Sequence, residues 1–232
     1  MQLTKVLKPG SRGVAILAVM TFAVSAAFSL LLYGQFASGY DLAIFSQAIH
    51  NYSEFNAPLV AVKGPHFNIL GDHFHPILVL LAPLYWVWND PRVLLLAQAF
   101  LIAASVPIVH RFAARHFNPR QAFVLAIGYA VGWPLQALAA FDFHEIAFGV
   151  PLIAWAIDSL DRKDDRGLIV ASALLVLVRE DMGLVVALLG ALRLLRRRRL
   201  AGQLLVVAGL AAYIIATVFV LPHFSTTGRF GY

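Results

Sequence analysis

Apolar runs follow one another along almost the whole chain, and they constrain its fold more than any other feature. A bilayer core takes about 20 helical residues to cross. The chain is 60% hydrophobic and only 13% charged, with a mean hydropathy of +0.78, which is too apolar for an ordinary soluble domain. We therefore expect an all-α, polytopic membrane protein. The runs are 14–33, 76–88, 93–109, 121–140, 146–160, 167–178, 182–195 and 200–222.

Basic residues indicate which of these runs cross the membrane. Cytoplasmic loops carry an excess of Lys and Arg, and the basic tracts lie before residue 14 and at 111–120, 161–166 and 193–199. All four are cytoplasmic only if 76–88 does not cross and if 167–178 and 182–195 are two separate crossings. We therefore expect about seven crossings with a cytoplasmic N-terminus, in a single domain over 1–232. Only Lys63, Arg92, Arg179 and Arg229 then lie outside.

Two alternatives to this topology involve the first run and the two short runs. The first run can be read as a cleaved signal peptide, but it is longer than the roughly 7–15 apolar residues of such signals. The residues 167–192 can be read as one long helix. That helix would place Arg179, Glu180 and Asp181 within the membrane, at a cost of about 2.5–3.5 kcal/mol for each charge. We therefore favour two short helices with a turn held inside the protein.

The first extracytoplasmic loop, 34–92, is long and has its own helical patterns. Within 40–52, Leu42, Phe45 and Ile49 recur at helical spacing, which predicts an amphipathic helix lying on the membrane. The run at 75–88 ends in aromatic residues, as helices at the membrane interface often do. We expect this run to be a juxtamembrane or re-entrant helix that begins and ends on the outer side.

Polar clusters interrupt the apolar pattern at "GYDL" (39–42), "KGPHFNILGDHFHP" (63–76), "FDFHE" (141–145) and "VREDMG" (178–183). The expected topology places all four on the outer side of one bundle. Carboxylates, imidazoles and an arginine gathered there are suited to accepting a proton, binding a metal or holding a phosphate. The net charge of +6 does not indicate nucleic-acid binding, because the basic residues lie in short tracts between apolar runs.

Each cluster also has a simpler structural interpretation. Asp41 can cap the helix that follows it, and Arg179 can pair with a neighbouring acid. His73 and His75 are two residues apart, so they converge on a metal only in a loop or an extended segment. "FDFHE" lacks the second histidine of a zincin helix. The chain has no cysteine, so neither a disulfide nor a thiolate metal site is available.

The order "YDLAIFSQAI … KGPHFNILGDHFHPILVLLAPLYWVW … FDFHE … LVRED" resembles a bacterial family of multispanning membrane proteins of unknown function, grouped with the GT-C glycosyltransferases. The resemblance covers residues from about 30 to 225. It implies a GT-C-like fold that transfers a sugar from a polyprenyl-phosphate donor at the extracytoplasmic face of the bacterial cytoplasmic membrane. Such proteins usually continue beyond the seventh helix, so we expect this chain to be truncated at its C-terminus.

The resemblance also implies roles for residues of this chain. Asp41 would act as catalytic base or help to hold a metal, and Arg179 and Lys63 would hold the donor phosphate. Asp72, His73 and His75 are the candidate ligands of a divalent metal ion. The cleft would be lined by Gln47, His66, Asn68, Asp142, His144, Glu145, Glu180 and Asp181. Two rival functions stay open: an ion-coupled carrier, whose ionisable groups usually lie on broken helices in repeated halves, and a non-catalytic scaffold subunit.

Overall fold

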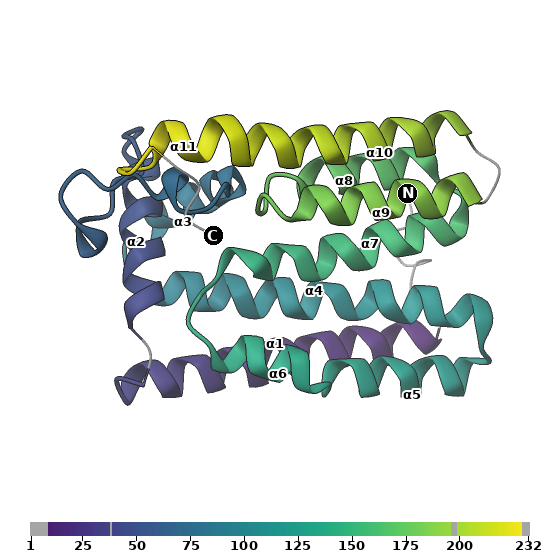
Figure 1. Ribbon diagram of the computed structural model, residues 1–232. Coiled ribbons are helices and arrows are strands. Elements are labelled where there is room, and N and C mark those ends of the chain that lie inside the picture. The colour runs from purple at the N-terminus through teal and green to yellow at the C-terminus, as the bar shows by residue number, and fades with distance from the viewer. Residues whose placement is uncertain (1–8, 38, 196–198, 229–232) are drawn as a thin grey trace, which may run out of the picture.

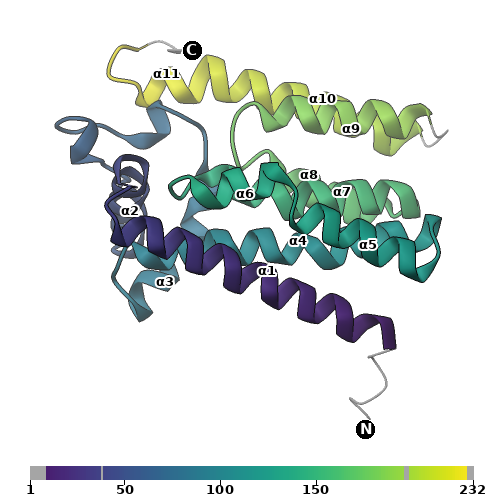
Figure 2. The same ribbon diagram turned by 90° about the horizontal axis from the view of Figure 1, so that it is seen from below.

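The computed structural model describes residues 9–37, 39–195 and 199–228, and this part of the chain is helical without a β-strand. Figure 1 shows most helices side by side, with α2 (Tyr40–Ser53) lying across one end of the bundle. Figure 2 shows α1 along one edge and the α9–α10 pair along the opposite edge. The other main helices are α1 (Pro9–Gly34), α4 (Arg92–His116), α5 (Pro119–Ala130), α6 (Trp133–Ala140), α7 (Gly149–Arg162), α8 (Asp165–Leu175), α9 (Met182–Leu195) and α10 (Arg199–Ile214).

Four helical stretches are long and apolar enough to cross a membrane, namely Arg12–Gly34, Arg92–His116, Pro119–Ala140 and Leu200–Phe224. This finding confirms the expectation of apolar helices of membrane-spanning length. The helices α7, α8 and α9 have 14, 11 and 14 residues, which gives lengths of only about 16–21 Å. A bilayer core is about 30 Å thick, so the seven crossings inferred from charge stay a prediction.

Prolines divide two of the predicted helical runs. The run at 121–140 breaks into α5 and α6 around Gly132, because Pro134 near the start of α6 has no backbone N–H to continue the helix. The run at 75–88 forms a 3₁₀ helix, η4 (Pro76–Leu81), followed by the short α3 (Ala82–Val87), which has Pro83 in its first turn. The predicted helix at 40–52 is confirmed as α2, which buries Leu42, Phe45 and Ile49.

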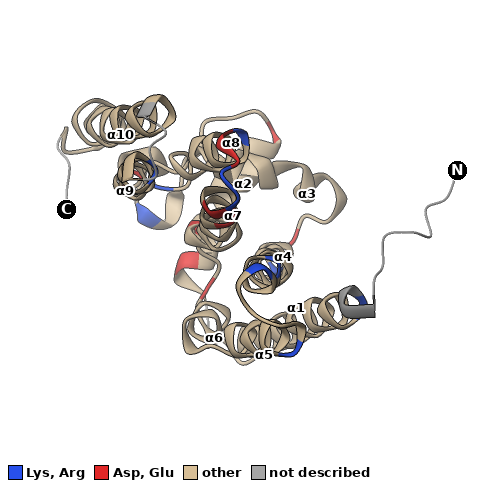
Figure 3. Cartoon of the chain, turned by 90° about the vertical axis from the view of Figure 1, so that its right-hand side faces the viewer, with Lys and Arg blue, Asp and Glu red and all other residues tan. Residues whose placement is uncertain are grey.

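Several Lys and Arg residues lie at the end of the bundle opposite α2, which faces the viewer in Figure 3. Buried Asp158 on α7 pairs there with Arg111 at 2.5 Å, Arg115 at 2.8 Å and Arg162 at 3.1 Å. Buried Arg193 on α9 pairs with Asp165 on α8. These pairs join α4, α7, α8 and α9. We call this end of the bundle the basic end. Residues 196–198 of the predicted cytoplasmic tract 193–199 lie outside the described residues.

Glycines bring the backbones of α9 and α10 into direct contact. A Cβ atom on Gly183 would lie 2.6 Å from the carbonyl oxygen of Gly209, and one on Gly190 would lie 2.8 Å from that of Gly202. Side chains at these positions would therefore clash with backbone. The glycine pattern explains how two apolar helices pack closely without a polar interface.

We expect Gly209→Ala to lower the free energy of unfolding by about 1–3 kcal/mol, because overpacked sites force the backbones apart. The new Cβ would lie 2.6 Å from the backbone nitrogen of Ala187. Gly128→Ala on α5 is the matched control, since nothing lies within 4 Å of its Cβ position and alanine favours helix by up to about 1 kcal/mol. Thermal unfolding in detergent measures both, and equal stabilisation by the two changes would contradict the close packing of α9 on α10.

Candidate functional site

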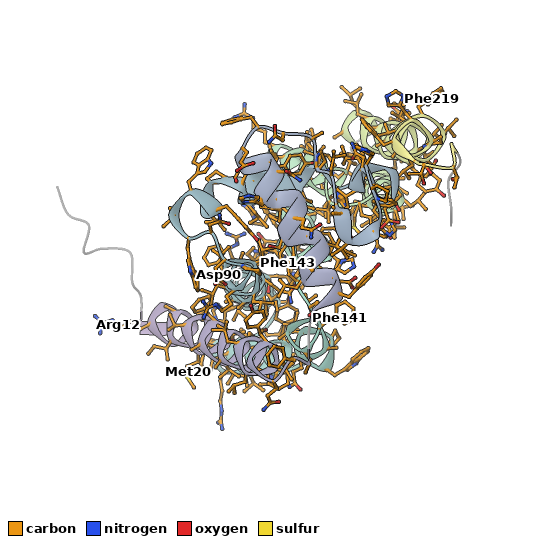
Figure 4. All side chains as sticks on the ribbon, turned by 90° about the vertical axis from the view of Figure 1, so that its left-hand side faces the viewer. Arg12, Met20, Asp90, Phe141, Phe143 and Phe219 are labelled. Carbon is orange, nitrogen blue, oxygen red and sulfur yellow. The ribbon has the colours of Figure 1, made fainter. Side chains whose placement is uncertain are left out.

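Segments from distant parts of the sequence meet at the α2 end of the bundle and enclose a cavity of about 210 Å³. The cavity brings together predicted site residues from three of the four polar clusters. Figure 4 looks onto this end, with Phe141 and Phe143 labelled in the segment that joins α6 to α7. The lining residues are Tyr40, Asp41, Ile44, Phe45, Lys63, Ile69, Asp72, His73, His75 and His144.

The start of α2 is held by Asp142, which belongs to the segment between α6 and α7. One oxygen of its carboxylate accepts hydrogen bonds from the backbone N–H groups of Gly39 at 3.0 Å, Asp41 at 3.2 Å and Leu42 at 3.3 Å. The capping role that the sequence allowed for Asp41 therefore belongs to Asp142. Asp142 itself is absent from the cavity lining, and its contribution is to fix the position of Asp41.

The carboxylate of Asp41 opens into the cavity from the first turn of α2. Within the part of the chain that the structure describes, it makes neither an ion pair nor a hydrogen bond, unlike Asp72, the other acid of the cavity wall, which pairs with Lys63. Asp41 can therefore accept a hydrogen bond or a proton from a ligand without first breaking a contact in the protein.

Lys63 enters the cavity from the loop between α2 and η4, where it forms an ion pair with Asp72. Two polar side chains shape this loop. The carbonyl oxygen of the Gln47 side chain accepts from the backbone of Val62 at 3.3 Å, and that of Asn68 accepts from the backbone of Leu70 at 3.0 Å. His66 is exposed and has a left-handed backbone with φ of 58°. None of Gln47, His66 and Asn68, all predicted to line the cleft, lines this cavity.

Glu180, in the turn between α8 and α9, anchors the loop that carries the histidines. Its carboxylate lies 2.8 Å from Nδ1 of His73 and accepts from the backbone N–H of Phe74 at 2.9 Å. The backbone of Ile77 also donates to the carbonyl of Leu177 at 3.0 Å. Glu180 is buried, with 7% of its surface exposed. It was predicted to line the cleft, but it lies behind His73 and supports that residue.

Burial and the neighbouring opposite charge shift the pKa values of His73 and Glu180 in opposite directions. Burial disfavours the charged forms of both His73 and Glu180, but their hydrogen bond and mutual attraction outweigh it. The pKa of His73 is therefore raised above its usual 6.5, and the pKa of Glu180 lies below its usual 4.5. His75 is completely buried, and burial lowers its pKa to about 4. The site therefore keeps His73 charged and His75 neutral side by side near pH 6.5.

Glu145 links the cavity to Arg179. It is fully buried, with one oxygen 2.7 Å from Nδ1 of His144 and the other 3.9 Å from the guanidinium of Arg179, although neither contact is aligned as a hydrogen bond. Arg179 pairs more closely with Asp181, at 2.9 and 2.5 Å. Arg179 and Asp181 lie outside the cavity lining. Arg179, which was predicted to bind the donor phosphate, is therefore separated from the cavity by Glu145 and by the lining residue His144.

The three predicted metal ligands lie in the cavity wall with different neighbours. Asp72 pairs with Lys63, His73 pairs with Glu180, and the ring of His75 packs edge-on against Phe45. Among the described residues there is no group of three or more His, Asp or Glu side chains that could hold a metal ion. The wall therefore presents hydrogen-bonding and charged groups rather than a ready coordination sphere.

The fold and the cavity define a helical membrane protein with a polar site at one end of its bundle. Residues 31–232 match the model of a family described as "Predicted membrane protein (DUF2079)", and the chain belongs to this family. The match includes every residue that lines the cavity. No curated protein and no solved structure matches the chain.

Proposed function

We propose that this protein is a GT-C-like glycosyltransferase that moves a sugar from a polyprenyl-phosphate donor to an acceptor at the extracytoplasmic face of a bacterial cytoplasmic membrane. The observation that carries the proposal is Asp41, a carboxylate without a partner among the described residues, in a cavity that also contains Lys63. A base and a cation are the two groups that glycosyl transfer with inversion requires.

In the proposed reaction, the acceptor oxygen forms a bond to the anomeric carbon, and the acceptor proton passes to Asp41. The bond between that carbon and the phosphate oxygen breaks, and its electron pair leaves with the polyprenyl phosphate. Lys63 would stabilise this leaving phosphate from the cavity wall, because cations aimed at developing charge lower the barrier, and Arg179, which lies behind the wall, would have to move past Glu145 to join it. Each is paired with a carboxylate, Asp72 or Asp181, so phosphate binding would replace those pairs.

The proposal includes seven crossings, with the N-terminus in the cytoplasm and the α2 end outside. The arginines gathered at the basic end support this orientation, because cytoplasmic ends carry the excess of basic residues. If only the four long stretches crossed, the segment from α7 to α9 would stay outside and the end of α10 would turn inward. Seven crossings therefore place residue 166 in the cytoplasm and residue 226 outside, whereas four crossings place residue 166 outside and residue 226 in the cytoplasm.

Because the chain has no native cysteine, single cysteines report its topology without background. In intact cells, we expect a membrane-impermeant maleimide to label Thr226→Cys at once, but Arg166→Cys only after permeabilisation. Both residues are exposed. Asn56→Cys, exposed in the first loop, is external in both topologies and serves as the control. Labelling of residue 166 in intact cells together with protection of residue 226 would reject the topology with seven crossings and support the one with four.

An ion-coupled carrier is the second candidate, and the buried carboxylates favour it. Glu145 is fully buried, and Glu180 lies at the turn between two short helices, where carriers often place ionisable groups. A carrier would move solute into proteoliposomes without any lipid-linked donor.

Transfer of labelled sugar from a panel of polyprenyl-phosphate sugars to lipid or peptidoglycan acceptors tests the proposed enzyme. We expect the purified wild-type protein in lipid to transfer from at least one donor, and Arg179→Ala to need more donor for the same rate. Absence of transfer with every donor, together with donor-independent uptake, would establish the carrier instead. Absence of both transfer and uptake would favour the non-catalytic scaffold subunit.

A further inference from the structure

His75 is a polar residue of the cavity whose hydrogen bonding among the described residues is incomplete, and unlike His144, whose Nδ1 lies 2.7 Å from Glu145, it has no charged side chain beside this nitrogen. Its side chain is 1% exposed, it lines the cavity, and its Nδ1 atom is buried without a hydrogen-bond partner among the described residues. The ring packs edge-on against Phe45, with 5.9 Å between the ring centres. His75 directly precedes Pro76, the first residue of η4.

A buried nitrogen without a partner is costly, because it loses its hydrogen bonds to water and gains none in the protein. Because His75 lines the cavity, a ligand group there could supply a hydrogen bond to the imidazole after a small movement of the ring. A neutral partner suits this position, because burying an ion beside the ring costs more than burying a neutral hydrogen-bonding group. A hydroxyl group fits, because it can donate to or accept from either tautomer.

The rest of the cavity wall also fits a neutral, hydroxyl-bearing ring. Lys63 and His73 have their charges balanced by Asp72 and Glu180, which leaves Asp41 as a carboxylate able to accept from a second hydroxyl. The exposed ring of Tyr40 and the buried ring of Phe45 supply apolar surface. A cavity of about 210 Å³ is small, so the ligand part inside it is of the order of one ring.

We propose that His75 hydrogen-bonds one hydroxyl group of a monosaccharide ring and thereby determines which sugar the cavity accepts. This inference rests on the proposed function for the nature of the ligand, but it concerns binding and does not require transfer. It gives His75 a role in specificity, whereas Asp41 has the proposed role in proton transfer. A site built to bind a particular hydroxyl discriminates strongly against an analogue that lacks it, because the buried partner is then left unpaired.

The test measures binding of methyl glycosides to the full chain in lipid nanodiscs, made without sugar-based detergent. The panel contains glucose, mannose and galactose glycosides, with analogues of each that lack one hydroxyl. For the wild type, we expect one missing hydroxyl to weaken binding by roughly 5- to 100-fold. In His75→Leu, binding of the parent sugar should weaken by a similar factor, and the missing hydroxyl should then make no difference.

Three comparisons make this test decisive. His75→Asn keeps a hydrogen-bonding group near the position of Nδ1, so it should retain part of the discrimination, and it replaces His75→Leu if that variant fails to fold. His223→Asn, exposed on α11 (Leu221–Phe224), should bind as the wild type does. Unchanged binding and unchanged discrimination in both His75 variants would overturn the inference, because only water would then satisfy the imidazole.

The outcomes also separate this inference from the proposed function. Sugar binding that depends on His75, without transfer from any donor, would support the inference and reject the transferase. Transfer with the same sugar preference in wild type and His75→Leu would support the transferase and reject the inference. If no glycoside of the panel binds, the inference is rejected.

Discussion

Asp41→Asn is expected to lower the rate of sugar transfer by about 10²–10⁴-fold, the usual contribution of a general base. Asparagine has nearly the same shape but cannot take the acceptor proton. The fold should persist, because the backbone N–H groups at the start of α2 are held by Asp142 rather than by Asp41. Loss of one acid near the helix N-terminus costs only about 0.3–1 kcal/mol.

Initial rates at saturating donor, beside thermal unfolding of the same preparation, measure this effect. Glu54→Gln is the matched control, because Glu54 is an exposed acid at the other end of α2. We expect the control to keep the wild-type rate. A folded Asp41→Asn protein that transfers at more than about a tenth of that rate would remove Asp41 from the role of base.

Glu180→Ala is expected to lower the free energy of unfolding by about 3 kcal/mol, because it breaks a buried charged pair and leaves a backbone donor unpaired. The donor is the N–H of Phe74, and the lost partner of the pair is His73. Both lie in the loop that forms one wall of the cavity. We therefore expect this wall to loosen and the binding of sugar to weaken together with stability.

The stability difference between wild type and Glu180→Ala should also depend on pH. The lowered pKa of Glu180 adds stability above its unfolded value of 4.5, which is lost as pH falls through the folded value. The raised pKa of His73 adds stability below its unfolded value of 6.5, which is lost as pH rises through the folded value. The difference should therefore be greatest between pH 4.5 and 6.5.

Chemical unfolding of both proteins in one detergent across this range measures that difference. Asp90→Ala provides a comparison, since Asp90 pairs with Arg92 away from the cavity and exposed pairs contribute at most about 1 kcal/mol. A Glu180 effect that stays constant with pH would mean that the pair with His73 does not contribute to stability.

Local patterns in the sequence predicted much of the fold. The spacing of Leu42, Phe45 and Ile49 predicted α2, because the buried residues on one face of a helix recur with a period of 3.6 residues. Charges at 179–181 correctly separated α8 from α9, since a continuous helix would have carried them into the membrane. The breaks at Gly132 and within 75–88 were missed, although Pro134 and Pro83 were visible signals for both.

The site was predictable only in part, because a sequence pattern does not show which distant residues pair. The cavity contains Asp41, Lys63, His73, His75 and His144, which the expected topology placed on one side of the bundle, but not His66. Asp142 and Glu180 were recognised as candidates, but their supporting roles depend on contacts about a hundred residues apart in sequence. The incomplete hydrogen bonding of His75 likewise has no local signal, since it follows from burial against Phe45 of another segment.

Photo-crosslinking of the wild-type protein in nanodiscs to a polyprenyl-phosphate sugar with a diazirine on its sugar ring tests the central claim most directly. We expect peptides containing 63–75 or 141–145 to be labelled, and unlabelled donor to suppress this labelling. Glu180→Ala should reduce this labelling together with the stability of the protein. Labelling confined to lipid-facing helices, or labelling that unlabelled donor does not suppress, would contradict a donor site in the cavity at the α2 end.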